Sequence, residues 1–124
     1  MSKLSENFDD SEFRCKCCGK LPENGMNPKL IELLQAIRDK LGRSITITPH
    51  GGYRCEHQNK KSGGAKHSQH VLGNAADIHV AGMDAHTVHG LIATHFNDRA
   101  KGLGKYKTFT HVDVRNGNLA RWNG

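Results

Sequence analysis

The sequence lacks a long apolar run. Its longest apolar stretch in 124 residues lies around Leu30 to Leu34, and it is amphipathic and far shorter than the roughly 20 residues that span a membrane. The first ten residues are polar, so we expect neither a membrane span nor an export signal. The length suits one domain over residues 1–124 with a single modest core.

Aromatic side chains are also few, with four Phe, two Tyr and one Trp. The 18 Lys and Arg exceed the 12 Asp and Glu, and the net charge of +6 favours an anionic partner such as nucleic acid, a membrane surface or an acidic cell-wall polymer. The basic residues are scattered and not interleaved with aromatic residues, which argues against a nucleic-acid interface. We therefore expect no nucleic-acid partner.

Cysteine is too sparse for the disulfide framework of a small secreted scaffold. Cys15 and Cys18 have the C-x-x-C spacing that suits a metal or a redox pair. One interpretation is ordinary buried or surface thiols, with one bridge to Cys55. The other is a structural zinc on Cys15, Cys18 and Cys55, with His57 or Cys17 as the fourth ligand.

Apolar periodicity predicts two helices. Asn27 is a helix cap, Pro28 occupies the first helical position, and leucine and isoleucine then recur at helical spacing until Gly42. The second helix follows the cap Asp84 and runs to about Asn97.

Alternation of apolar and polar residues predicts strands over 44–48, 76–80, 102–106, 109–115 and 118–122. A glycine-broken basic loop occupies 51–64, and Asn116-Gly117 predicts a type I′ hairpin between the last two strands. The expected fold is α+β, with helices packed on a small, mainly antiparallel sheet.

Histidine is abundant, with nine copies, and three segments place it near a carboxylate. His70 lies in a glycine-containing loop, and Asp77 opens the next strand on the face opposite the apolar residues. A later strand places His111 and Asp113 on one face in the same way. Three nitrogen or oxygen ligands are typical of catalytic zinc, so His70, Asp77 and His111 form a candidate set. The alternative is that they are solvated surface residues.

Three segments and one tryptophan carry a resemblance to a known family. Ser68 to Asp77 matches S-x-H-x-x-G-x-A-x-D, the signature of zinc peptidases that include bacterial D-alanyl-D-alanine carboxypeptidases, phage endolysins and the Hedgehog signalling domain. Thr110 to Arg115 resembles the H-V-D-x-R strand of the murein endopeptidase and phage branch, Gly52-Tyr53-Arg54 resembles its S-G-Y-R segment, and Trp122 fits its ending.

The resemblance implies a Hedgehog-like fold with one zinc ion on His70, Asp77 and His111. It also implies that Arg54 binds a substrate carboxylate and that Ser68 lies close to the substrate. The expected function is hydrolysis of an amide in peptidoglycan stem or cross-link peptides, at a D,D bond or at the L-alanyl-D-glutamate link. Residues 26–122 form the catalytic core, after a cysteine-containing segment over 1–25.

The chain also departs from the family's carboxypeptidases. They have an acidic base three residues before the last zinc histidine and often a histidine two positions further upstream, where this chain has Thr108 and Tyr106. Gly51 stands where the family usually has a serine, and the neighbouring His50 could fill the space of that serine side chain. Asp113 is then the candidate general base, and its competing role is to orient a ligand histidine by a hydrogen bond.

Other interpretations remain open. A binding module could keep the zinc fold without turnover, and a metal or redox protein could centre on Cys15 and Cys18. Of the remaining histidines, His57, His67 and His79 are secondary candidates for substrate contact. We expect the histidines on or beside the second helix to be solvated, namely His86, His89 and His95. We expect a monomer that stays cytoplasmic until phage or prophage lysis releases it, or that travels in a virion.

Overall fold

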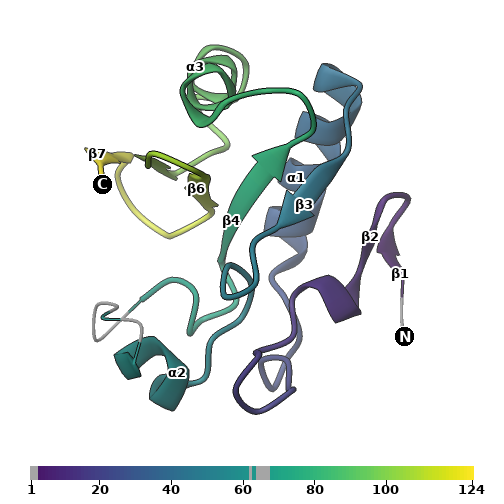
Figure 1. Cartoon of the computed structure of the whole chain (residues 1–124), viewed down its shortest axis with the longest axis vertical. Coiled ribbons are helices and arrows are strands. Elements are labelled where there is room, and N and C mark those ends of the chain that lie inside the picture. Colours follow the sequence, from purple (N-terminus) through teal and green to yellow (C-terminus); the bar gives the residue numbers. More distant parts are fainter. Residues whose placement is uncertain (1–2, 62, 64–67) are drawn as a thin grey trace.

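Figure 1 shows the computed structural model, which describes residues 3–61, 63 and 68–124. The elements follow the order β1 (Lys3–Ser5), β2 (Phe8–Asp9), 3-10 helix η1 (Asp10–Glu12), α1 (Pro28–Leu41), β3 (Ile45–Ile47), α2 (Glu56–Lys61), β4 (Ala75–Val80), α3 (Ala85–His95), β5 (Gly102–Lys105), β6 (Thr110–Asp113) and β7 (Ala120–Asn123). None of the helices described is both long enough and apolar enough to cross a membrane.

The main sheet has the strand order β3-β4-β6-β5-β7. All of its neighbouring strands are antiparallel except β5 and β7, which are parallel. Helix α1 lies behind β3 and β4 in the view, and α3 lies at the top, where it contacts β4, β5 and β6 (Figure 1). The predicted α+β fold with a mainly antiparallel sheet is confirmed.

Helix α1 begins and ends where its capping residues predict. The Asn27 side chain accepts a hydrogen bond from the backbone N–H of Lys29 at 2.9 Å, and Pro28 follows at the first helical position. Gly42 ends the helix with a φ of 64°, a left-handed conformation that glycine adopts without strain. Its buried side chains join those of β3, β4, β6 and α3 in one core.

The N-terminal segment packs into that same core. Phe8, Phe13 and Met26 are buried members of the core cluster, and Cys15 is also buried. This segment forms the small β1–β2 sheet and η1, neither of which the sequence analysis predicted. Helix α2 was also missed, because its six residues fall in the segment predicted to be a loop.

The predicted hairpin at Asn116-Gly117 is wrong. Strand β6 is already paired on both edges, by β4 and by β5, so β7 cannot pair with it. Instead the chain crosses over, and β7 joins the free edge of β5 in parallel. A type I′ turn needs positive φ at both central residues, whereas among the described residues only glycines, Gly117 included, have positive φ.

Candidate metal centre

Two neighbouring strands bring the first two candidate ligands together. Asp77 of β4 and His111 of β6 are direct partners in the antiparallel register, so their side chains leave the sheet side by side. His111 Nδ1 lies 3.0 Å from Asp77 Oδ1. This pairing follows from strand register, which sequence alternation by itself does not reveal.

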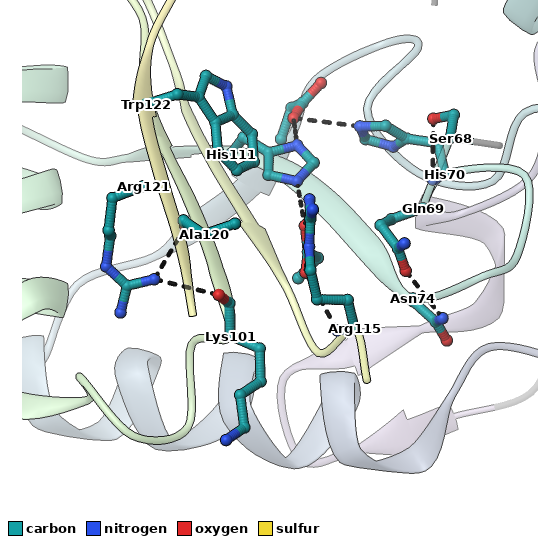
Figure 2. Close-up of polar contacts among 12 residues, drawn as sticks. Ser68, Gln69, His70, Asn74, Lys101, His111, Arg115, Ala120, Arg121 and Trp122 are labelled. Atoms are coloured by element: carbon teal, nitrogen blue, oxygen red, sulfur yellow. Dashed lines mark hydrogen bonds and ion pairs between the residues drawn. The ribbon is translucent and has the colours of Figure 1, made fainter. Parts of the chain in front are cut away.

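A tight turn carries the third candidate ligand. The backbone N–H of Asn74 donates to the Gln69 carbonyl at 3.0 Å, and that of Gly73, with a φ of 75°, donates to the His70 carbonyl at 3.3 Å. The turn places His70 Nε2 at 3.4 Å from Asp77 Oδ1. Dashed lines in Figure 2 join both His70 and His111 to carboxylate oxygens.

The three side chains form a buried cluster with the chemistry of a metal site. His70, Asp77 and His111 are 4%, 5% and 7% exposed, and one ligand atom of each lies within 4.8 Å of the other two. Two imidazole nitrogens and a carboxylate oxygen are ligands that zinc accepts. The set therefore fits a zinc ion.

Hydrogen bonds on the outer side of each imidazole orient the two rings. His70 Nδ1 lies 3.0 Å from the Gly52 carbonyl, so it carries the proton and Nε2 is left as the ligand atom. In His111 the roles are reversed, because Nε2 lies 2.7 Å from Asp113 Oδ2 and Nδ1 faces the cluster. Both rings are thus held with one nitrogen directed at Asp77.

Asp113 is fully buried and held on two sides. Its Oδ2 accepts from His111 Nε2 and, at 2.7 Å, from Arg115 Nη2, while Oδ1 accepts from Arg115 Nε at 2.9 Å. Burial raises the pKa of Asp113, but these hydrogen bonds outweigh it and hold the pKa well below the usual range. The carboxylate therefore stays charged and has few lone pairs left for another partner.

Asp77 also stays ionised. Burial raises its pKa, but hydrogen bonds with His111 and His70 outweigh burial and lower the pKa to about 2. Burial likewise lowers the pKa of His111, and the hydrogen bonds to Asp113 and Asp77 reverse this and raise it. Both carboxylates are thus ionised, with Asp77 facing the two imidazoles and Asp113 paired with His111 and Arg115 on the outer side of the ring.

Arg54 contacts the same centre from the loop before α2. Its Nη2 lies 3.4 Å from Asp77 Oδ2, its Nε donates to the His50 carbonyl at 2.8 Å, and its Nη1 donates to Asn59 Oδ1 at 3.3 Å. Its side chain is 14% exposed. A guanidinium has five N–H donors, so two have no partner among the residues that the structure describes.

Ser68 has a structural contact of its own. Its hydroxyl oxygen accepts a hydrogen bond from the backbone N–H of His70 at 3.2 Å, which stabilises the start of the turn (Figure 2). Of the other sequence candidates, His57 and His79 have exposed side chains, and His67 lies outside the described residues. His50, next to Gly51, is exposed as well.

Sequence reasoning missed the role of two glycines in β5. A Cβ atom at Gly102 would collide with the Asp113 carboxylate, and one at Gly104 would collide with the Trp122 ring. Trp122 in turn packs against His111, with ring centroids 5.0 Å apart (Figure 2), and the Arg115 guanidinium carbon lies 5.2 Å from the centroid of its ring. Glycine at alternate positions of a strand signals such a close approach.

Comparison with known families agrees with this geometry. A family model described as Peptidase M15 matches residues 6–113, which is most of the chain. The match includes all three candidate ligands and most of the cysteine-containing segment over 1–25. A search of curated proteins found no match.

Proposed function

The chain belongs to the zinc-dependent peptidase M15 family, and on that premise we propose that it hydrolyses an amide bond in peptidoglycan peptides. The proposed type is an endolysin or murein endopeptidase that acts on stem or cross-link peptides. One observation carries the proposal, namely the convergence of two oriented imidazoles and an ionised carboxylate within 4.8 Å. The excess of positive charge on the chain suits the anionic polymers of a bacterial wall.

His70, Asp77 and His111 would hold a single zinc ion, through Nε2, a carboxylate oxygen and Nδ1 respectively. Zinc supplies a Lewis acid that polarises the scissile carbonyl and lowers the pKa of a water molecule toward neutrality. The protein's own part is to keep both imidazoles correctly turned, which the Gly52 carbonyl and Asp113 do.

For Asp113 we propose the orienting role in place of the general base. Its carboxylate meets the His111 nitrogen that points away from the cluster, and its low pKa makes it a weak proton acceptor. The ion pair with Arg115 also holds the carboxylate on the outer side of the ring. Asp113 would thus act through His111 and not on the substrate.

Arg54 would bind a carboxylate of the peptide stem. Three of its N–H groups fix the guanidinium against His50, Asn59 and Asp77, and the remaining two can form a paired contact with a carboxylate. Ser68 would lie next to the bound peptide at the start of the His70 turn. Together they would orient the peptide before its amide is attacked.

The test is digestion of purified cell walls by the zinc-loaded chain, with mass spectrometry of the released peptides. We expect peptide release that identifies the bond, and its loss in His111→Ala and on treatment with a chelator. His95→Ala is the matched control, since His95 is exposed at the end of α3 and should leave activity unchanged. A folded wild-type chain that holds zinc and binds walls without releasing peptide would overturn the proposal in favour of a binding module.

A further inference from the structure

A second cluster of metal-ligating side chains lies outside the proposed active site. Cys15, Cys18 and Cys55 each offer a sulfur atom, and these atoms all lie within 4.8 Å of one another. Cys15 Sγ and Cys55 Sγ are 3.6 Å apart although 40 residues separate them in the sequence. All the cysteines are free thiols.

The local backbone is folded so that two of these sulfurs converge. The N–H of Gly19 donates to the Cys15 carbonyl at 2.7 Å, and the N–H of Cys15 donates to the Lys20 carbonyl at 2.9 Å. Gly19 has a φ of 72°, which allows the chain to reverse directly after Cys18. The turn thus brings Cys18 back toward Cys15, so the two cysteines of the C-x-x-C motif lie within one tight loop.

Backbone donors also surround the sulfurs. The N–H of Cys55 donates to Cys15 Sγ at 3.4 Å, and the N–H of Gln58 donates to Cys55 Sγ at 3.4 Å. Such N–H···S contacts stabilise the thiolate form that binds metal.

We propose that Cys15, Cys18 and Cys55 hold a second zinc ion of the structural type. Thiolates select zinc among the divalent ions of the cell, and a cluster built from one C-x-x-C turn and one distant cysteine is a common arrangement for it. On binding, each of the three thiols would release its proton to solvent.

Such an ion would stabilise the segment around Gly52 and Arg54, which carries parts of the proposed catalytic centre. Between the two cysteine segments, the N–H of Tyr53 donates to the Phe13 carbonyl at 2.8 Å, and Gly52 lies so close to Phe13 that a Cβ atom would collide with its backbone. The Gly52 carbonyl is the acceptor that orients His70, and Arg54 directly precedes Cys55. Tying Cys55 to the N-terminal turn therefore fixes both groups.

The experiment counts zinc in the full chain after purification in zinc and removal of loosely bound metal. We expect about two zinc ions per wild-type chain, and about one in Cys15→Ser/Cys18→Ser and in His70→Ala/His111→Ala. Cobalt replacement gives an independent measurement on the wild-type chain. Only a thiolate site produces intense sulfur-to-cobalt charge-transfer absorption, so this band should vanish in the cysteine variant and persist in the histidine variant.

Cys17→Ser is the matched control, because it removes an exposed thiol of the same motif that is not among the three converging ligands. We expect it to retain the second zinc and the cobalt band. Loss of both in Cys17→Ser, retention of both in Cys15→Ser/Cys18→Ser, or a Cys15–Cys55 disulfide in the freshly purified chain would each overturn the proposal. The zinc count of the cysteine site does not depend on peptidase activity, so an inactive chain with two zinc ions would refute the proposed function alone.

Discussion

The proposed catalytic centre has a strand half and a loop half, and they are stabilised differently. In the strand half, Asp77 and His111 are register partners in the middle of the sheet, with strands on both sides of β4 and β6. In the loop half, His70 and Arg54 sit on segments held by turns and single hydrogen bonds. Sheet pairing is cooperative, whereas a turn can shift by itself.

This contrast indicates how each half should respond to substitution. A change in the strand half alters ligand chemistry or crowds a packed sheet, so its effects on metal binding should be large. Apart from replacement of His70 itself, a change in the loop half should shift a group that binds substrate or orients a ligand, and its effects should be smaller and graded. The four predictions below test that ranking from the largest effect to the smallest.

Asp77→Asn in the strand half should reduce peptide release to the level of a sample without enzyme. The amide has nearly the same shape but no charge, so it removes the ionised ligand and leaves Arg54 without its ionised partner. Zinc content and wall digestion are the measurements. Asp98→Asn is the control because Asp98 is exposed, and equal activity in both variants would contradict the assignment of Asp77 as a ligand.

Gly102→Ala should weaken zinc binding at the His70 site on the order of tenfold to a hundredfold, because the added methyl displaces the Asp113 carboxylate that orients His111. Competition with a zinc chelator, monitored by zinc content, measures the effect. Gly90→Ala is the control, since a Cβ atom there meets nothing within 4 Å. If the two alanine variants bind zinc alike, Asp113 does not have the orienting role.

Arg54→Lys in the loop half should lower kcat/KM by about tenfold while zinc content stays the same, because lysine cannot form a paired contact with a carboxylate and loses about one charge-assisted hydrogen bond. Kinetics on a defined stem peptide measure this, and an amidated peptide should show a smaller difference between the variants. Exposed Arg43→Lys serves as the control. Loss of zinc in Arg54→Lys would instead make Arg54 a support for Asp77 alone.

Asn27→Ala should have the smallest effect, a loss of about 1 kcal/mol in the free energy of unfolding. The side chain caps α1 and donates to Asn74 Oδ1 at 3.0 Å, while the Asn27 N–H donates to the Gly73 carbonyl within the His70 turn. Denaturant unfolding of the zinc-free chain measures the change, with exposed Asn118→Ala for comparison. A larger loss of zinc affinity than in Gly102→Ala would break the ranking of the two halves.

Sequence predicted the elements whose signals are local. Helix α1 was predicted from Asn27, Pro28 and Gly42, because capping and helix termination depend on neighbouring residues. The three candidate ligands came from a ten-residue signature and a short strand motif, and the structure brings them together. The roles predicted for Arg54, Ser68 and the ligands themselves stay predictions, and the experiments above test those of Arg54 and of the ligands.

What sequence could not predict depends on contacts between distant segments. The hairpin at Asn116-Gly117 had the right local residues, but the pairing of β6 on both edges determined the outcome. Sequence analysis placed Cys55 with Cys15 and Cys18 only as one of several interpretations, because their convergence depends on a tertiary contact that spacing within either segment does not encode. The glycine pair in β5 could have been found in the sequence, because the two glycines alternate. The side chains that approach them, Asp113 and Trp122, follow only from the pairing of the strands.

The two outer hydrogen bonds of the proposed centre also differ in what mutation can do to them. The acceptor for His70 is the main-chain carbonyl of Gly52, a group that every amino acid carries, so no single replacement of the side chain deletes it. The acceptor for His111 is the side chain of Asp113, which a single codon change can remove. Laboratory evolution of this chain should therefore adjust metal affinity through residue 113 and its neighbours, while the orientation of His70 changes only when the backbone around residue 52 moves.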